Sequence, residues 1–286
     1  LMHTKPFWTA TLLAFFMLGG HALTASATTD NKTPNTAWEP VRGQAGKDVI
    51  WIPTPEGLID KMLTAAKVTE QDRLFDLGSG DGIIAITAAR KFGAQSVGIE
   101  FNPDMAQFAR RKVNEAGLND KVRIITGDIF KEDFSSATVV TLYLMSHLNL
   151  QLRPILLKMK PGTRVVSHAF TMGDWEPDET MQHDYSRAYY WMVPAQVAGD
   201  WVITGLEGGP VRLRMSQTFQ HIGGTMTRGG MTQALMGARL QGEELKFRFS
   251  TPDQTVHTFT GRVEGKRMTG SVSSGFTNAS IEGVRQ

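Results

Sequence analysis

A glycine-rich turn carries the clearest chemical signal in this sequence. Gly78, Gly80 and Gly82 occupy alternate positions directly after the short apolar run Leu74–Leu77, which contains the carboxylate of Asp76. Glycine lets a backbone turn sharply and approach a ligand that a Cβ would repel. The run that follows favours a helix, whose positive end would point at that ligand. The stretch therefore predicts a strand, a tight turn and a helix around a small-molecule site.

The residues around this turn distinguish one class of ligand from another. A dinucleotide-binding loop needs a third glycine where Ile83 stands, which argues against a nicotinamide oxidoreductase. A phosphate-binding loop needs a Gly-Lys-Ser/Thr sequence, which the turn lacks. The carboxylate of Asp76 suits the amino group of an amino acid better than a pyrophosphate. These departures favour S-adenosylmethionine over NAD or ATP.

Two further carboxylates end predicted strands of the same sheet. Glu100 lies 24 residues (100 − 76) beyond Asp76, which is where a ribose diol is held in such folds. Phe101 follows it and is expected to lie against the adenine. Asp128 stands in a Gly-Asp-apolar turn after the third strand. Because the ends of parallel strands meet at one edge of a sheet, we expect the three carboxylates to share one cavity.

The stretch Asp76–Gly82 resembles the first motif of class I S-adenosylmethionine-dependent methyltransferases. The resemblance implies a seven-strand sheet and S-adenosylmethionine as the cofactor. It also implies that the Asp128 carboxylate accepts from the adenine amine and that the backbone amide of Ile129 donates to the ring. The residues expected to bind the cofactor are Asp76, Gly78, Ser79, Gly80, Glu100, Phe101, Asp128 and Ile129.

The segment after the fourth strand faces the transferred methyl group in this superfamily. Here it is similar to the Tyr-Leu-x-x-x-x-Asn pattern of bacterial methyltransferases related to the seven-strand protein-lysine methyltransferases, with Tyr143 and Asn149 at the matching positions. Both are expected to position the acceptor. The Asp/Asn-Pro-Pro-Tyr motif used on nucleobases is absent, and no nucleic acid is expected as a partner. His147 is a candidate base, although a lone histidine in a loop is more often a surface residue.

The expected reaction is an in-line displacement at a sulfonium, in which the protein mainly holds donor and acceptor collinear. A protein lysine or a small amine is the expected acceptor, and a dry, apolar pocket would favour its uncharged form. The alternative is an exported binding or assembly protein, whose methyltransferase-like domain no longer turns over and whose C-terminal β domain does the work.

Composition narrows the remaining classes of site. The 286 residues include no cysteine, which excludes disulfides, thiolate metal sites and cysteine nucleophiles. A formal net charge of +2 is too small to indicate nucleic-acid binding. His168 and His183 have a spacing that fits no metal-ligand template, so no metal is expected.

The N-terminal residues predict export. Lys5, an apolar run from Phe7 to Leu18 and the small residues Ala25-Ser26-Ala27 form the pattern of a signal peptide over residues 1–27. An exported, periplasmic protein is expected, or a membrane-anchored one if the segment is not cleaved. The polar residues 28–48 are typical of a linker.

The periodicity predicts an α/β domain followed by an all-β domain. Residues 49–194 are expected to form a Rossmann-like, doubly wound methyltransferase sheet, and residues 195–286 a small antiparallel barrel or sandwich of unknown role. Thr54 is expected to cap the first helix, and Pro53-Thr54-Pro55 to help cover the cofactor, as the resembled branch implies. Residues 170–184 are expected to form a polar loop. The strands expected in the first domain are 73–77, 95–100, 122–125, 137–143, 163–167 and 188–193.

Overall fold

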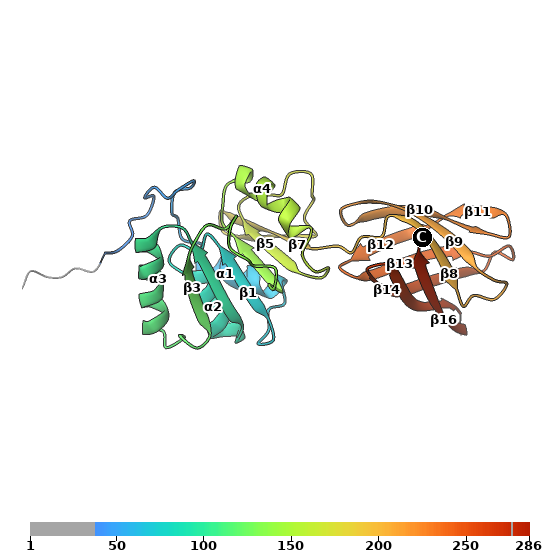
Figure 1. Cartoon of the computed structure of the whole chain (residues 1–286), viewed down its shortest axis with the longest axis horizontal. Coiled ribbons are helices and arrows are strands. Elements are labelled where there is room, and N and C mark those ends of the chain that lie inside the picture. The colour runs from blue at the N-terminus through green and yellow to red at the C-terminus, as the bar shows by residue number, and fades with distance from the viewer. Residues whose placement is uncertain (1–37, 276) are drawn as a thin grey trace, which may run out of the picture. The chain divides into compact units, whose positions relative to one another are not determined.

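Two β-sheets, each with its own hydrophobic core, organise the computed structural model, which describes residues 38–275 and 277–286 (Figure 1). The first sheet has seven strands and the second has nine. The predicted signal peptide lies outside the described residues, so export stays a prediction. Among the described residues, no helix has both the length and the apolar character needed to cross a membrane.

The first sheet is mainly parallel. Its strand order is β3-β2-β1-β4-β5-β7-β6, and the first five strands in this order run parallel. β7 runs antiparallel to β5, and β6 pairs with β7 as a hairpin at the edge. The strands are β1 (Arg73–Leu77), β2 (Gln95–Glu100), β3 (Val122–Thr126), β4 (Val139–Leu142), β5 (Arg164–His168), β6 (Glu179–His183) and β7 (Ser186–Met192).

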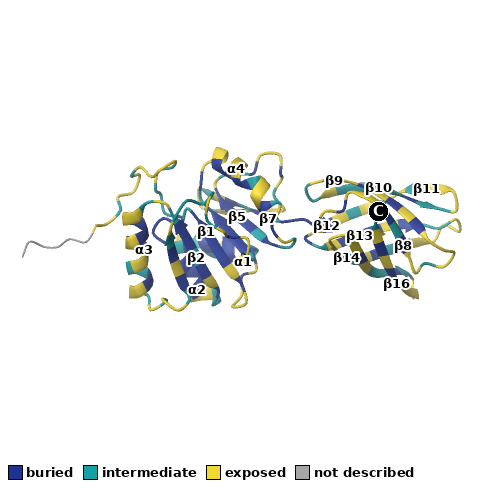
Figure 2. Cartoon of the chain, in the orientation of Figure 1, coloured by how far each residue is buried: buried dark blue, intermediate teal, exposed yellow. Residues whose placement is uncertain are grey.

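Helices cover both faces of this sheet, because successive strand residues point to opposite sides. Leu74 and Val139 pack in a cluster with α1 and α2, whereas Phe75 and Val140 pack in a cluster with α4. The central strands are buried on both faces (Figure 2). The doubly wound α/β fold is therefore confirmed. The helices are α1 (Glu56–Ala65), α2 (Ile83–Phe92), α3 (Pro103–Glu115) and α4 (Ser146–Leu156).

Two local predictions are wrong. Thr54 does not cap α1, whose N-cap is Pro55 without a side-chain hydrogen bond, because the Thr54 hydroxyl is paired with His168 instead. The predicted loop over residues 170–184 contains β6. This strand lies at the edge of the sheet with most of its side chains exposed or half-buried, so it shows no apolar alternation that would reveal it.

The second sheet is antiparallel throughout, in the order β11-β10-β9-β8-β16-β15-β14-β13-β12. The sheet curls so that strands near its two ends meet. The Gln233 side chain in β11 both donates to and accepts from the backbone of Ser250 in β13. The stretch from Met231 to Gln241 forms two strands, which are separated at Leu235. The bounds are β8 (Gly199–Thr204), β9 (Val211–Thr218), β10 (His221–Arg228), β11 (Met231–Ala234), β12 (Met236–Gln241), β13 (Glu244–Ser250), β14 (Val256–Glu264), β15 (Arg267–Ser274) and β16 (Thr277–Arg285).

Candidate cofactor and acceptor site

A cavity of about 270 Å³ lies at the carboxyl ends of the parallel strands. The predicted site residues after β1, β2, β3 and β4 all line it, although they are far apart in the sequence. The prediction that the acidic strand ends share one cavity is therefore confirmed in geometry. The predicted residues that line the cavity are Asp76, Gly78, Ser79, Gly80, Glu100, Phe101, Asp128, Ile129 and Tyr143.

The glycines of the turn are required by both conformation and space. Gly78 and Gly80 have φ angles of +76° and +54°, a region that other residues rarely adopt. A Cβ on Gly78 would lie 2.7 Å from the side chain of Leu144, and a Cβ on Gly80 would lie 2.7 Å from Nε1 of Trp51. A side chain at either position would therefore displace Leu144 or Trp51, both of which line the cavity.

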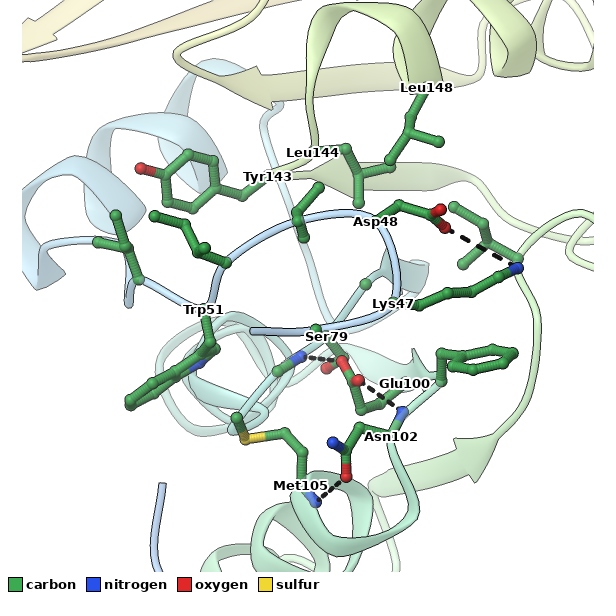
Figure 3. A pocket seen from close by; sticks show the side chains of 18 of the residues that line it. Lys47, Asp48, Trp51, Ser79, Glu100, Asn102, Met105, Tyr143, Leu144 and Leu148 are labelled. Atoms are coloured by element: carbon green, nitrogen blue, oxygen red, sulfur yellow. Dashed lines mark hydrogen bonds and ion pairs between the residues drawn. The ribbon is translucent and has the colours of Figure 1, made fainter. Parts of the chain in front are cut away.

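Glu100 fixes the turn and presents a carboxylate to the cavity. Its oxygens accept hydrogen bonds from the backbone amides of Gly80 (2.8 Å) and Asn102 (2.9 Å), as Figure 3 shows. Burial raises the pKa of this carboxyl group, against the lowering effect of the amides. The position and remaining acceptor capacity of the two oxygens fit the hydroxyls of a ribose.

Asp76 lies deeper, with 2% of its surface exposed. One oxygen accepts from the hydroxyl of Thr141 at 2.7 Å. Burial raises the pKa of Asp76 to about 6, and the nearby carboxylates of Asp81 and Glu100 add to the increase. The described residues give Asp76 no ion pair, so this buried charge fits a ligand that carries an ammonium group.

Residues 44–54, which we call the strap, form another wall of the cavity. Within the strap, a backbone bridge joins Ala45 to Ile50 and folds the segment back on itself. Residues 44–48, predicted to belong to a linker, line the cavity instead, because long-range contacts hold them there. Pro53 and Thr54, expected to help cover the cofactor, are also among the lining residues.

Lys47 of the strap reaches the predicted adenine side of the cavity. Its Nζ lies 3.1 Å from Oδ2 of Asp128 and 4.5 Å from the ring centroid of Phe101. A backbone hydrogen bond from Phe130 and the contact with Lys47 lower the pKa of Asp128. No local pattern marks Lys47 in the sequence, because its partner lies 81 residues further along the chain.

Tyr143 and Phe170 lie at the end of the cavity that the loops after β4 and β5 form. Their ring centroids are 6.4 Å apart. Asn149 does not line the cavity: it is fully buried, and its Nδ2 donates to Oγ of Ser167 (3.1 Å) and to the carbonyl of Phe170 (3.1 Å). Asn149 thus supports the loop that carries Phe170. His147 is exposed and does not line the cavity, so its position does not support a role as the base.

Several lining residues were not singled out from the sequence. Trp51, Leu144 and Phe170 are apolar or aromatic residues that single-sequence patterns assign to a core or a loop. Nothing local marks them, except that Trp51 stands next to the Pro-Thr-Pro stretch and that Leu144 follows Tyr143. Their place in the cavity results from the fold.

Comparisons with known proteins agree with this geometry. The family model of the ANTKMT methyltransferase domain matches residues 76–179. A protein-lysine N-methyltransferase of Saccharolobus islandicus is 43% identical over 136 residues, which are 47% of this chain and 84% of that enzyme. A lysine N-methyltransferase of Mus musculus, named for a subunit of ATP synthase, is 31% identical over 124 residues, and the match covers 43% of this chain and only 50% of that enzyme.

A solved structure shows the same fold with a ligand related to the expected cofactor. It is described as an RNA methyltransferase from Salinibacter ruber in complex with S-adenosyl-L-homocysteine. It is 50% identical, covers 51% of this chain and 96% of its own, and has a TM-score of 0.50. S-adenosylmethionine is the cofactor that the glycine turn and the carboxylates fit. The chain belongs to the class I S-adenosylmethionine-dependent methyltransferases.

Proposed function

We propose that the protein transfers a methyl group from S-adenosylmethionine to the side-chain amine of a protein lysine. The observation that carries this proposal is the apolar and aromatic end of the cavity, with Tyr143, Leu144 and Phe170. The similarity to lysine methyltransferases supports it. The name of the Salinibacter ruber relative points to RNA instead, so the acceptor needs a direct test.

Different residues of the cavity would bind different parts of the cofactor. When bound, S-adenosylmethionine supplies an electrophilic methyl group on a sulfonium. Glu100 would hold the ribose diol, Asp128 the adenine amine and Asp76 the ammonium of the methionine part. Such positioning is the main way in which a protein accelerates a displacement of this kind.

The acceptor amine must arrive without its extra proton. An apolar surrounding lowers the pKa of a lysine, because it disfavours the charged form. Tyr143 and Phe170 provide such a surrounding, and burial raises the pKa of Tyr143, so its phenol stays protonated at neutral pH. No general base is assigned, since a lysine made neutral by burial needs none.

The test compares acceptors side by side. Purified protein is incubated with S-adenosylmethionine and either a lysine-rich peptide or the same peptide with arginine at each lysine position. A third reaction contains a mixture of RNAs. Methyllysine in the first peptide alone, detected by mass spectrometry, is the expected result. Methylation confined to RNA would contradict the lysine proposal while leaving the methyltransferase class intact.

The proposal of an exported enzyme depends on residues 1–27 alone. Cell fractionation that recovers the chain outside the cytoplasm, shortened at its N-terminus, would support it, and a full-length cytoplasmic chain would contradict it. The alternative of a non-catalytic binding protein receives no support from the comparisons.

A further inference from the structure

Three side chains from distant parts of the sequence contact one another at the acceptor end of the cavity, and two of them are buried. Oγ1 of Thr54, in the strap, lies 3.0 Å from Nδ1 of His168, at the end of β5. The His168 ring in turn lies against the ring of Tyr143, with centroids 3.8 Å apart and planes inclined by 33°. Tyr143 lines the cavity. Thr54 therefore contacts Tyr143 through His168.

Burial shields the contact between Thr54 and His168 from water. Thr54 is 5% exposed and His168 is 4% exposed, so the threonine hydroxyl and the imidazole have little access to water. A buried polar group that loses its partner suffers the full penalty of desolvation. Burial also lowers the pKa of His168 to about 4, so the ring is neutral at neutral pH. A neutral ring against Tyr143 does not repel the sulfonium of the cofactor.

The turn after β5 adds a second constraint. Ala169 has a φ of +65°, which residues with a Cβ seldom adopt, and the amide of Phe170 donates to the carbonyl of His168 at 2.8 Å. Strained backbone of this kind persists only where its surroundings hold it. The turn sends His168 to the interior and Phe170 to the cavity wall.

We propose that Thr54 and His168 are positioning residues for methyl transfer, which together hold the Tyr143 ring in the orientation in which it faces the acceptor. The inference rests on the proposed assignment of Tyr143 to the acceptor end. The strap then has a second role besides lining the cavity, because the Thr54 hydroxyl fixes the Tyr143 ring through His168.

The test is a set of variants read by kcat, by affinity for S-adenosylhomocysteine and by thermal unfolding. Thr54→Val replaces the hydroxyl with a methyl group of similar size, and we expect kcat to fall about tenfold, since small misplacements at a reacting centre are costly. Because Thr54 also lines the cavity, the affinity for S-adenosylhomocysteine is expected to fall by less than kcat does, and Thr54→Ser is expected to restore kcat. Thr163→Val is the matched control, because Thr163 is also buried and hydrogen-bonded but lies at the opposite end of β5.

A double-mutant cycle separates positioning from general destabilisation. His168→Phe keeps an aromatic ring beside Tyr143 but cannot bind the Thr54 hydroxyl. The double variant is expected to lose no more kcat than either single variant, because both changes break one contact. Additive losses of kcat in the double variant, or an unchanged kcat in Thr54→Val, would overturn the inference. If Thr54→Val does not fold, His168→Phe and Thr54→Ser still test it.

The inference and the proposed function can fail separately. If the wild-type protein methylates RNA and not the lysine peptide, the lysine assignment is wrong. The kcat ratios of the same variants, measured on RNA, then still decide whether Thr54 and His168 position the transfer.

Discussion

At the scale of single residues, Asp76 shows how a site built for a cation destabilises the free protein. Its carboxyl group is buried and accepts a hydrogen bond from the Thr141 hydroxyl, but it has no ion pair in the described structure. A buried carboxylate without a cation is unfavourable, because burial disfavours the charged form. The ammonium group of the cofactor would supply the missing positive charge.

We predict that Asp76→Asn stabilises the free protein and weakens cofactor binding. The folded pKa of about 6 lies above the ordinary value of 3.8, so the folded state binds more protons between these values and wild-type stability falls as pH rises from about 4 to 6. Above pH 6 the cost is complete, at most about 3 kcal/mol. Asparagine avoids this cost and keeps an oxygen for Thr141.

Urea unfolding of the wild type and Asp76→Asn from pH 4 to 8, without cofactor, measures this difference. The gain for Asp76→Asn should grow up to about pH 6 and then level off. A gain that is equal at all pH values, or absent, would show that the carboxylate is not the group responsible.

We predict that Glu100→Gln lowers the affinity for S-adenosylhomocysteine by about 10–100-fold, the range of one or two charged hydrogen bonds. The glutamine amide would turn its NH₂ toward one of the amides that Glu100 accepts from, so the turn also loses a hydrogen bond. Calorimetric titration measures the change. Glu115→Gln, on the exposed surface of α3, is the control and should bind like the wild type.

At the scale of elements, the glycine turn and the strap depend on each other. Trp51 lies so near Gly80 that no side chain fits at that position. The turn therefore needs glycine for its own conformation and for the seating of the strap. A substitution in the turn should therefore alter both the conformation of the turn and the position of the strap.

We predict that Gly80→Ala and Gly93→Ala both lower stability, Gly80→Ala the more because of its clash with Trp51, but that only Gly80→Ala abolishes cofactor binding. Both glycines have positive φ angles, +54° and +76°, so alanine is strained by about 1–2 kcal/mol in each. Gly93 is the C-cap of α2, where a Cβ would meet Glu70 and not the strap. Thermal unfolding and titration with S-adenosylhomocysteine measure the two effects, and equal binding by both variants would contradict the prediction.

The sequence predicts the elements whose signal is local and misses those held by distant contacts. The strand, turn and helix around Gly78 follow from short-range rules, and the carboxylates after β1, β2 and β3 follow from the order of parallel strands. The strap has no periodic pattern, and Thr54 finds its partner 114 residues away. Its local sequence favours a helix cap, a role that tertiary contact overrides.

At the scale of the whole molecule, the site and the second sheet are separate. Every residue that lines the cavity falls between Gln44 and Phe170, and the nine-stranded sheet has its own core, which includes Trp201, Phe247 and Phe259. The antiparallel domain that the sequence predicts is therefore present, and no described residue of it belongs to the cavity.

We predict that a chain ending at Pro194 binds S-adenosylhomocysteine within about threefold of the full-length affinity, because every lining residue of the cavity precedes Pro194. It should fold with lower stability, because it loses the Phe219 ring that stacks on Trp175 in the first core. Circular dichroism checks folding and calorimetric titration checks binding. A folded fragment that no longer binds would mean that the second domain contributes to the cofactor site.

The strap is synthesised before Asp128 and His168, the residues that its side chains bind. The partners of Lys47 and Thr54 arrive 81 and 114 residues later, and such long-range contacts form late because a long loop must first be closed. We therefore expect the strap to dock on the cavity only after β5 has joined the sheet. In that order of events, the glycine turn would be accessible to the cofactor before the strap covers it.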